Sequence, residues 1–397
     1  MSTTLRRKPG KRGHAASEAS TVEPRDADGA DDTKALPAVA AAENGWFRPS
    51  AGGWFARAAA WVLLLWLILA VPANVLSPFD FGVSDINLAI AAVIFAIIGL
   101  SLNVLIGYAG QLSLGHQAFV GIGAFASAYV VTNLGLGFWF GVVVAAGFGA
   151  VQALALGAVS LRVTGLYFAL VSLAYGTFAE NSLFAVSEIT GGEGGKPADR
   201  PAGFAEDQMY YFLCLAFLVL VLWLDWRLTR SKGGRALQAL RENPRVAASY
   251  GIDVRRYTLL AFVVSGTFAG IGGALMAHHQ QIIVPGIFDF QLALIFVVMT
   301  VVGGLRNRIG VVIGSAFFAG LGEGGGSEGG GFLERTIGLP AEFTGIVIGP
   351  FLLLIVITLL PGGIGQLIGP VKDWMLGKRF DRNAGKLKEV EVSDVRA

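Results

Sequence analysis

The chain has 397 residues, of which 54% are hydrophobic and only 15% are charged, and its formal net charge is +2. A soluble protein carries about 25% charged residues, so this composition excludes a string of soluble domains. The small net charge also excludes a basic nucleic-acid-binding surface. We therefore predict an all-α, polytopic membrane protein. Its single cysteine, Cys214, lies in an apolar run and can form no internal disulfide.

Charged residues are concentrated at the two ends of the chain. Residues 1–48 contain eight Lys or Arg and seven Asp or Glu, and residues 372–397 contain seven and five. Large apolar side chains are nearly absent from the first 45 residues, so we expect residues 1–50 to form a disordered cytoplasmic tail. The first apolar stretch starts near Trp54, too late for a secretory signal peptide. Residues 51–371 would form the transmembrane domain and residues 372–397 a second cytoplasmic tail.

Apolar segments recur along residues 51–371. A bilayer core about 30 Å thick requires roughly 20 apolar residues per helix, which predicts about ten transmembrane helices, with eight as the lower bound. Several segments are rich in Gly and Ala, as is typical of helices that pack closely on one another. The ten segments are residues 54–76, 86–107, 114–132, 137–159, 165–186, 208–226, 257–279, 288–304, 309–322 and 343–360.

The distribution of basic residues predicts the orientation. With ten crossings and a cytoplasmic N-terminus, twelve of the fifteen basic residues between the two tails fall in cytoplasmic loops, eight of them in residues 227–256. Both termini are therefore predicted to be cytoplasmic. Residues 187–207 and 322–341 are then extracytoplasmic loops.

Residues 107–124 form the most unusual apolar segment, because polar residues stand among glycines and alanines. Gln111, Ser113, His116 and Gln117 are its polar members. Glycine permits sharp turns, and non-helical backbone at membrane depth requires protein or water around it. This segment is either part of a transport pathway or gate, or an ordinary turn between two helices.

Glu180 and Asn181 lie within the predicted span 165–186. A carboxylate inside the membrane is costly and by default indicates function, so both residues are candidates for the pathway. Because they lie toward the outer end of the span, a position in contact with water is the alternative.

The inner loop 227–256 contains a predicted short helix outside the membrane. Asn243 is a suitable N-cap, Pro244 suits the first helical position, and Gly251 can end the helix in a left-handed conformation. Small residues on one face of this helix favour docking into a groove of another protein. The alternative is a basic loop held against lipid headgroups.

Two candidate motifs for nucleotide or metal binding do not meet the requirements of such sites. The glycine-rich string 191–197 lacks the spacing and the Ser or Thr of a phosphate-binding loop. His278 and His279 are adjacent, so on a helix they point about 100° apart and make a poor metal pair. We therefore expect no catalytic residue, no metal site, no cofactor and no ATP hydrolysis in this chain.

Several ordered motifs resemble the LivM-type permease subunits of branched-chain amino-acid ABC importers. The resemblance covers about residues 84–370, with two departures. Ser249 stands where the family commonly has an acidic residue, and the Gly/Glu-rich residues 322–331 match no family feature. The motifs that carry the resemblance are residues 107–124, 161–174, Glu180 with 190–192, 234–252, 261–274, 302–314 and 361–363.

This resemblance implies a subunit that pairs with a second, non-identical permease, two cytoplasmic ATPase subunits and an extracytoplasmic solute-binding protein. It also implies a multi-pass location in a bacterial inner or plasma membrane. The loop around Gly251 would be the ATPase coupling segment. The residues assigned to that segment are Gly234, Arg235, Arg241, Glu242, Asn243, Ala247, Ala248 and Gly251.

The expected function is uptake of branched-chain or other apolar amino acids, driven by ATP that separate subunits hydrolyse. A urea or short-amide permease of the same branch is the nearest alternative, because an apolar pathway with few charges suits either solute. An ion-coupled secondary transporter is a more distant one, since only Glu180 offers an ionisable site within the membrane and ion coupling usually needs several.

Overall fold

The computed structural model describes residues 83–163, 165–319 and 363–366, together with positions 58, 59, 62 and 66. The chain divides into residues 1–46 and 47–397, and all described residues belong to the second unit. Its helices include two π-helical segments, η1 and η2. The elements are α2 Val83–Asn103, η1 Val104–Ala109, α3 His116–Thr132, α4 Phe138–Ser160, α5 Leu166–Phe178, η2 Ala179–Leu183, α6 Ser187–Thr190, η3 Gly192–Gly194, β1 Lys196–Pro197, α7 Asp207–Arg230, α8 Lys232–Glu242, α9 Pro244–Ser249, α10 Val254–Gln280, β2 Ile282–Ile283, η4 Pro285–Ile287, α11 Phe290–Gly303 and α12 Arg308–Phe318.

Each predicted span that falls in the described residues coincides with helix. Among the described residues, four helices are long and apolar enough to cross a membrane, or five if α5, η2 and the segment 187–194, which meet at an 84° bend, form one span. Helices α11 and α12 are apolar but shorter. The predicted all-helical, polytopic character is thus confirmed for the described residues. The predicted spans 54–76 and 343–360, both tails and residues 322–341 lie outside them, so ten spans remains a prediction.

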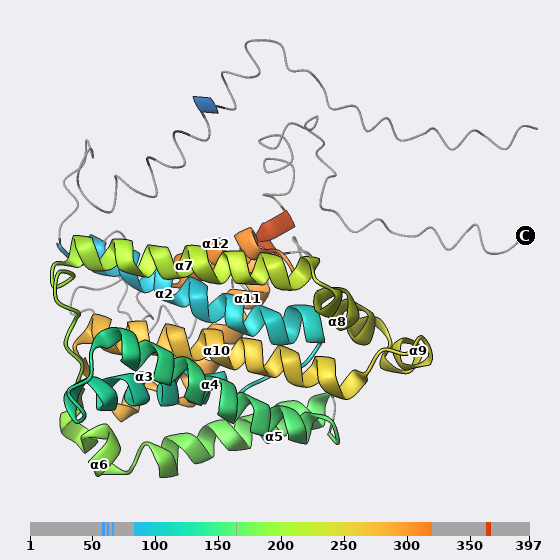
Figure 1. The fold of residues 1–397 in the computed structure, drawn as a ribbon, viewed down its shortest axis with the longest axis horizontal. Coiled ribbons are helices and arrows are strands. Elements are labelled where there is room, and N and C mark those ends of the chain that lie inside the picture. Colours follow the sequence, from blue (N-terminus) through green and yellow to red (C-terminus); the bar gives the residue numbers. More distant parts are fainter. Residues whose placement is uncertain are drawn as a thin grey trace, which may run out of the picture. The chain divides into compact units, whose positions relative to one another are not determined.

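Helix α10 runs through the middle of the bundle, between α2 and α4 (Figure 1). Glycines allow this close approach: a Cβ atom built on Gly266 would lie 2.2 Å from the carbonyl oxygen of Gly149, and one on Gly273 would lie 2.0 Å from that of Val120. Small residues let helix backbones approach each other within a membrane, where hydrophobicity alone does not drive association. The glycine-rich composition therefore serves helix packing.

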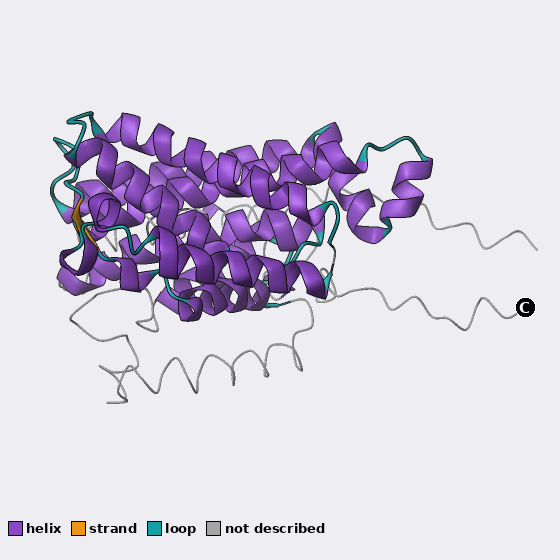
Figure 2. Ribbon diagram, turned by 90° about the horizontal axis from the view of Figure 1, so that it is seen from below, coloured by secondary structure: helices purple, strands orange, loops and turns teal. Residues whose placement is uncertain are grey.

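The connecting segments gather at two ends of the bundle. At one end, β1 pairs antiparallel with β2, and Thr132 Oγ1 donates a hydrogen bond to the carbonyl oxygen of Pro197 at 2.7 Å. Helices α8 and α9 lie at the other end and extend beyond the long helices (Figures 1 and 2). This separation agrees with the predicted alternation of loops between two sides. Which side is cytoplasmic stays a prediction.

Candidate functional site

The polar segment predicted as a pathway forms the non-helical entry to α3. Gly110, at φ +69°, ends η1, and α3 begins only at His116. The Nε2 atom of His116 lies 2.7 Å from Oγ of Ser101. Ser101 precedes Gly107 by six residues along α2 and η1, so the contact ties the first residue of α3 to a position within α2. Residues 111–115 therefore form a non-helical link between η1 and α3.

Unpartnered polar atoms are concentrated in this segment. Ser113, His116 and Gln117 are completely buried. Within the described part of the chain, Gln111 Oε1, Ser113 Oγ, His116 Nδ1 and both amide atoms of Gln117 are buried without a hydrogen-bond partner. Nearly all buried polar groups in proteins have one, so a cluster of exceptions indicates groups that serve something outside the chain. The structure brings these four predicted residues together, and their role in a pathway stays a prediction.

Glu180 and Asn181 lie apart from that cluster. Both belong to the π-helical segment η2, where Glu180 is half-buried and Asn181 is exposed. Asn181 Nδ2 donates a hydrogen bond to the carbonyl oxygen of Thr177 at 2.9 Å. Among the hydrogen bonds and ion pairs of the described residues, none joins either residue to residues 111–117.

An apolar recess of about 770 Å³ opens between α3, α4 and α5. This volume falls within the range of small-molecule pockets, about 300–1,000 Å³. Its polar members are paired: Tyr175 donates its hydroxyl to Oε1 of Gln152 at 2.8 Å, and Gln152 Nε2 donates to the carbonyl oxygen of Phe119 at 3.3 Å. Lining residues include Ile122, Phe125, Phe148, Gln152, Tyr175 and Phe184.

The predicted coupling segment forms two helices, α8 and α9. Ser231 caps α8 through its Oγ atom, which accepts from the backbone N–H of Gly234 at 3.2 Å. Gly234 packs against α7, where a Cβ atom would lie only 2.3 Å from the carbonyl oxygen of Leu228. Arg235 is exposed and donates to the carbonyl oxygen of Arg230 at 3.1 Å. The sequence analysis predicted α9 but not α8.

Helix α9 matches the predicted short helix. Asn243 Oδ1 accepts from the backbone N–H groups of Arg245 and Val246 at 3.0 and 3.2 Å, and Pro244 opens the helix. Gly251 follows at φ +79°. Of the two predicted docking residues on this helix, Ala247 is buried and Ala248 is exposed. Docking of α9 into a partner is not tested by the described residues.

Arg241 joins the coupling segment to the polar segment. Its guanidinium donates to the carbonyl oxygen of Gly107 in η1, and a Cβ atom built on Gly110 would lie 3.0 Å from Cγ of Arg241. Burial lowers the pKa of the Arg241 guanidinium, and the positive charge of Arg306 acts in the same direction. The neighbouring Glu242 forms an ion pair with Arg306 at 3.6 Å. Residues 241 and 242 thus hold α8 against η1 and the turn before α12.

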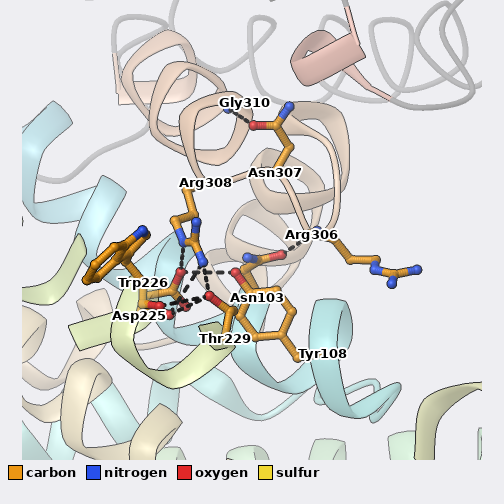
Figure 3. Close-up of polar contacts among 9 residues, drawn as sticks. All are labelled: Asn103, Tyr108, Asp225, Trp226, Thr229, Arg306, Asn307, Arg308 and Gly310. Carbon is orange, nitrogen blue, oxygen red and sulfur yellow. Dashed lines mark hydrogen bonds and ion pairs between the residues drawn. The ribbon is translucent and has the colours of Figure 1, made fainter. Parts of the chain in front are cut away.

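A second set of contacts centres on Asp225, which is completely buried in α7 (Figure 3). Its carboxylate pairs with the Arg308 guanidinium, and Tyr108 donates its hydroxyl to Oδ2 at 3.0 Å. The same guanidinium donates to Oγ1 of Thr229. This cluster, the Asp225 cluster, ties together η1, α7 and the start of α12.

The turn before α12 is held by side-chain caps. Asn103 Oδ1 accepts from the backbone N–H of Arg306 at 2.9 Å, and Arg306 adopts φ +70°. Asn307 Oδ1 accepts from the backbone N–H of Gly310 at 3.2 Å (Figure 3). Both contacts place Arg306 and Arg308 at the end of the bundle that carries α8.

The sequence analysis did not identify the Asp225 cluster. The structure buries this carboxylate within α7. One signal was available: the predicted topology puts Asp225 and Arg308 on the same side. Opposite charges in an otherwise apolar body are expected to pair, because a single buried charge is costly.

Metal-binding geometry is absent from the described residues: no group of three or more His, Cys, Asp or Glu side chains there could hold a metal ion. The His278 ring is instead used in hydrogen bonds, with Nδ1 2.7 Å from the carbonyl oxygen of Asp199 and Nε2 2.9 Å from Oγ of Ser127. These contacts give His278 a structural role between α10, α3 and the loop before α7.

Comparison with known proteins places these features in a family context. The family model described as the permease component of the branched-chain amino acid transport system matches residues 85–359. The high-affinity branched-chain amino acid transport system permease protein LivM of Escherichia coli strain K12 is 32% identical over 277 residues, covering 63% of this chain and 65% of the relative. The LivM protein of Salmonella typhimurium matches with the same identity and coverage.

A shorter match involves the probable branched-chain amino acid transport permease protein LivH of Methanocaldococcus jannaschii, which is 39% identical over 97 residues, 24% of this chain and 30% of the relative. The chain spans 65% of the length of the LivM relatives, slightly less than two thirds. No solved structure matches.

Proposed function

The chain belongs to the permease-component family of branched-chain amino acid transport systems, and from this premise we propose that it is the transmembrane permease subunit of an ATP-driven ABC importer for branched-chain or other apolar amino acids. The observation that carries the proposal is the family match over residues 85–359, which includes both the polar segment and the coupling segment. The LivM relatives support the substrate class, since they are named for high-affinity branched-chain amino acid transport.

The proposed assembly has three kinds of contact surface on this chain. A second permease subunit pairs with this chain in the bilayer, two cytoplasmic ATPase subunits bind at α8 and α9, and a solute-binding protein docks on residues 187–207 and 322–341. ATP hydrolysis belongs to the separate ATPase subunits, and this chain supplies the pathway. We place the complex in a bacterial inner or plasma membrane with both termini of this chain in the cytoplasm.

The proposed mechanism moves solute by alternating the opening of the bundle. Closure of the ATPase subunits pushes α9 and α8, and Arg241 carries that movement to Gly107 in η1, next to the polar segment. The polar side chains of residues 111–117 line the solute pathway, with Glu180 and Asn181 nearer its outer end. The coupling residues are those assigned from the sequence, namely Gly234, Arg235, Arg241, Glu242, Asn243, Ala247, Ala248 and Gly251.

Uptake into proteoliposomes that carry the whole complex tests this proposal. We expect L-leucine to accumulate only when ATP is present on the side of the membrane that carries the ATPase subunits and when the solute-binding protein is also present. Gly251→Asp is the variant, because Gly251 is exposed at φ +79° beside α9 and a charged side chain there would disturb docking without entering the bundle. Uptake that survives both this substitution and the removal of ATP would rule out an ABC importer.

A further inference from the structure

The start of α3 is an uncapped helix N-terminus inside the bundle. Helix α3 has 17 residues, and its N-cap residue, Gly115, has no side chain to accept from the first backbone N–H groups. These groups have no partner within a helix, and aligned peptide dipoles place a partial positive charge there. An anionic group is stabilised at such a position, as at the broken helices of many transporters.

Unpartnered polar side chains surround this N-terminus. Ser113 and Gln117 are completely buried, and Oγ of Ser113 and both amide atoms of Gln117 lack partners among the described residues. The Gln117 amide lies beside the N-cap: a Cβ atom built on Gly176 would be 2.5 Å from Gln117 Nε2 and 2.9 Å from Cα of Gly115. Hydroxyl and amide donors thus stand next to the uncapped backbone.

Helix α5 covers this place in the present structure. The Ser172 Oγ atom accepts a hydrogen bond from the backbone N–H of Leu114 at 2.9 Å. A Cβ atom built on Gly115 would lie 1.9 Å from the carbonyl oxygen of Ser172. The Ser172 hydroxyl therefore occupies a position in front of the N-terminus where an oxygen atom of a ligand could accept the same hydrogen bond.

The connections of α5 allow it to move as a unit. Gly165, directly before α5, has φ +64°, and the π-helical segment η2 follows it before the 84° bend to the segment that starts at Ser187. One face of α5 is free of contacts, with Leu166 and Tyr167 each 74% exposed. Positions that absorb backbone rotation at both ends of a helix are typical of a hinged element.

Helix α3, by contrast, is anchored at its first residue. The Ser101 hydroxyl donates to the carbonyl oxygen of Ser265 at 2.9 Å, so we assign the 2.7 Å contact with His116 as a hydrogen bond from Nε2–H to the same hydroxyl. Ser265 returns a hydrogen bond to the carbonyl oxygen of Ser101 at 2.8 Å. His116 thus fixes the start of α3 to α2 and α10, whereas α5 is held by the Ser172 and Tyr175 hydrogen bonds and by the contact of the Phe168 ring with Phe262.

We propose that the start of α3 is a carboxylate-binding site for a zwitterionic amino acid, and that α5 closes it in this structure. The inference rests on the proposed function and names the site within it. When α5 separates, the ligand carboxylate replaces the Ser172 hydroxyl and accepts from the Leu114 backbone N–H, the Ser113 hydroxyl and Nε2 of Gln117. Oε1 of Gln117 accepts from the ligand ammonium group.

An apolar side chain of the ligand has a place beside this site. Tyr175 lines the apolar recess of about 770 Å³, and the next residue, Gly176, touches the Gln117 amide. The recess and the polar site therefore adjoin neighbouring faces of α5, about 100° apart around the helix. An amino acid with an aliphatic side chain suits both parts.

Ligand-dependent stability of the purified transporter complex in nanodiscs, without the solute-binding protein, tests the site directly. A ligand that binds the folded state raises the unfolding midpoint. We expect L-leucine to raise it, and L-leucinamide and urea, which lack a carboxylate, to have no effect. Ser113→Ala and Gln117→Met should each weaken the apparent affinity for L-leucine about ten-fold or more, since each removes a hydrogen bond to a charged group. Ser127→Ala, a buried serine elsewhere on α3, should leave the response to L-leucine unchanged.

A reversible cross-link tests the role of α5. The 2.9 Å contact between Leu114 N and Ser172 Oγ places the two residues within reach of a disulfide. In the double variant Leu114→Cys with Ser172→Cys, we expect oxidation to abolish the response to L-leucine and reduction to restore it. Restoration by a reductant separates closure of the site from misfolding.

Four outcomes would overturn the proposal. Two concern the wild-type complex: L-leucine fails to raise the unfolding midpoint, or L-leucinamide or urea raises it equally. The other two concern variants: Ser113→Ala and Gln117→Met both keep the wild-type response to L-leucine, or the oxidised double variant keeps it in full. A different result would refute the ABC importer but support the site: uptake proceeds without ATP, while L-leucine raises the unfolding midpoint of the wild-type complex and not of the two variants.

Discussion

The Asp225 cluster and the polar segment 111–117 use polar groups in opposite ways, although they are close in the fold. In the cluster, charged groups are held by several partners at once: Asp225 contacts Arg308 and Tyr108, and Arg308 also contacts Thr229. In the polar segment, the neutral side chains of Ser113, His116 and Gln117 are completely buried and much of their hydrogen-bonding capacity is unused. Charged groups here join helices, whereas the neutral polar groups retain unused hydrogen-bonding capacity.

The two regions are also connected. Tyr108 reaches Asp225 from η1, the Arg241 guanidinium binds the carbonyl oxygen of Gly107 in the same segment, and Gln111 follows two residues after η1 ends. We therefore expect a displacement of α8 to reach η1 directly, and the polar segment through a few residues of backbone. The following predictions test this division of roles, in order of decreasing effect.

The largest effect is expected at Asp225. Replacing it with Ala leaves the Arg308 guanidinium without its carboxylate partner, and removing one member of a buried ion pair costs about 3–5 kcal/mol. The unfolding midpoint of the complex in detergent should fall accordingly. Asp253→Ala is the control: its ion pair with Arg256 is exposed, with a 3.8 Å separation, and its N-cap hydrogen bond from the Arg256 backbone N–H is expected to contribute only about 1 kcal/mol. Equal losses for the two variants would contradict a special role for the cluster.

Arg241→Met should separate ATP hydrolysis from transport. The substitution keeps an apolar stem beside Gly110 but removes the charge-assisted hydrogen bond to the carbonyl oxygen of Gly107. We expect this loss to lower L-leucine uptake about ten-fold. ATP hydrolysis by the complex should stay near its wild-type rate. Arg162→Met, an exposed arginine in another loop that is predicted to be cytoplasmic, provides the control. A parallel fall in hydrolysis and uptake would indicate damage to ATPase docking instead of lost transmission.

Gly115→Ala tests how tightly α5 covers the start of α3. The new methyl group would lie 1.9 Å from the carbonyl oxygen of Ser172, so α5 must shift, and overpacking of this kind costs about 1–3 kcal/mol. Gly147→Ala in α4 is the matched control, because a Cβ atom there meets nothing within 4 Å. It should be neutral or stabilising, by about 0.5–1 kcal/mol, since Ala favours helix over Gly. Thermal unfolding of both variants measures the difference.

The smallest effect on stability is expected from a comparison of two buried serines on or next to α3, Ser127 and Ser113. Ser127 donates its hydroxyl to Nε2 of His278 at 2.9 Å, because Nδ1 of that ring faces the carbonyl oxygen of Asp199. Ser127→Ala leaves an unpaired acceptor and should cost about 1–2 kcal/mol. Ser113→Ala removes an atom that has no partner, so the unfolding midpoint without ligand should stay constant or rise. A loss at Ser113 equal to that at Ser127 would show that Ser113 is partnered after all.

Much of the local structure was predictable. The apolar segments within the described residues correspond to helices, and Asn243, Pro244 and Gly251 occupy the predicted positions around α9. Helix formation depends on the length of an apolar run, and capping depends on residues within one turn, so both are readable from adjacent positions. Helix α8 was missed because its eleven residues are too polar to register as a span.

The sequence alone also identified the family resemblance and the polar character of residues 111–117. It did not reveal that these groups lack partners, that Ser172 covers them, or that Asp225 pairs with Arg308 across 83 residues of chain. Those facts depend on which helices become neighbours, and that is decided by the close packing of small residues along α3, α4 and α10. A membrane sequence encodes its spans one by one, but the hydrogen bonds between them exist only once the helices are packed together.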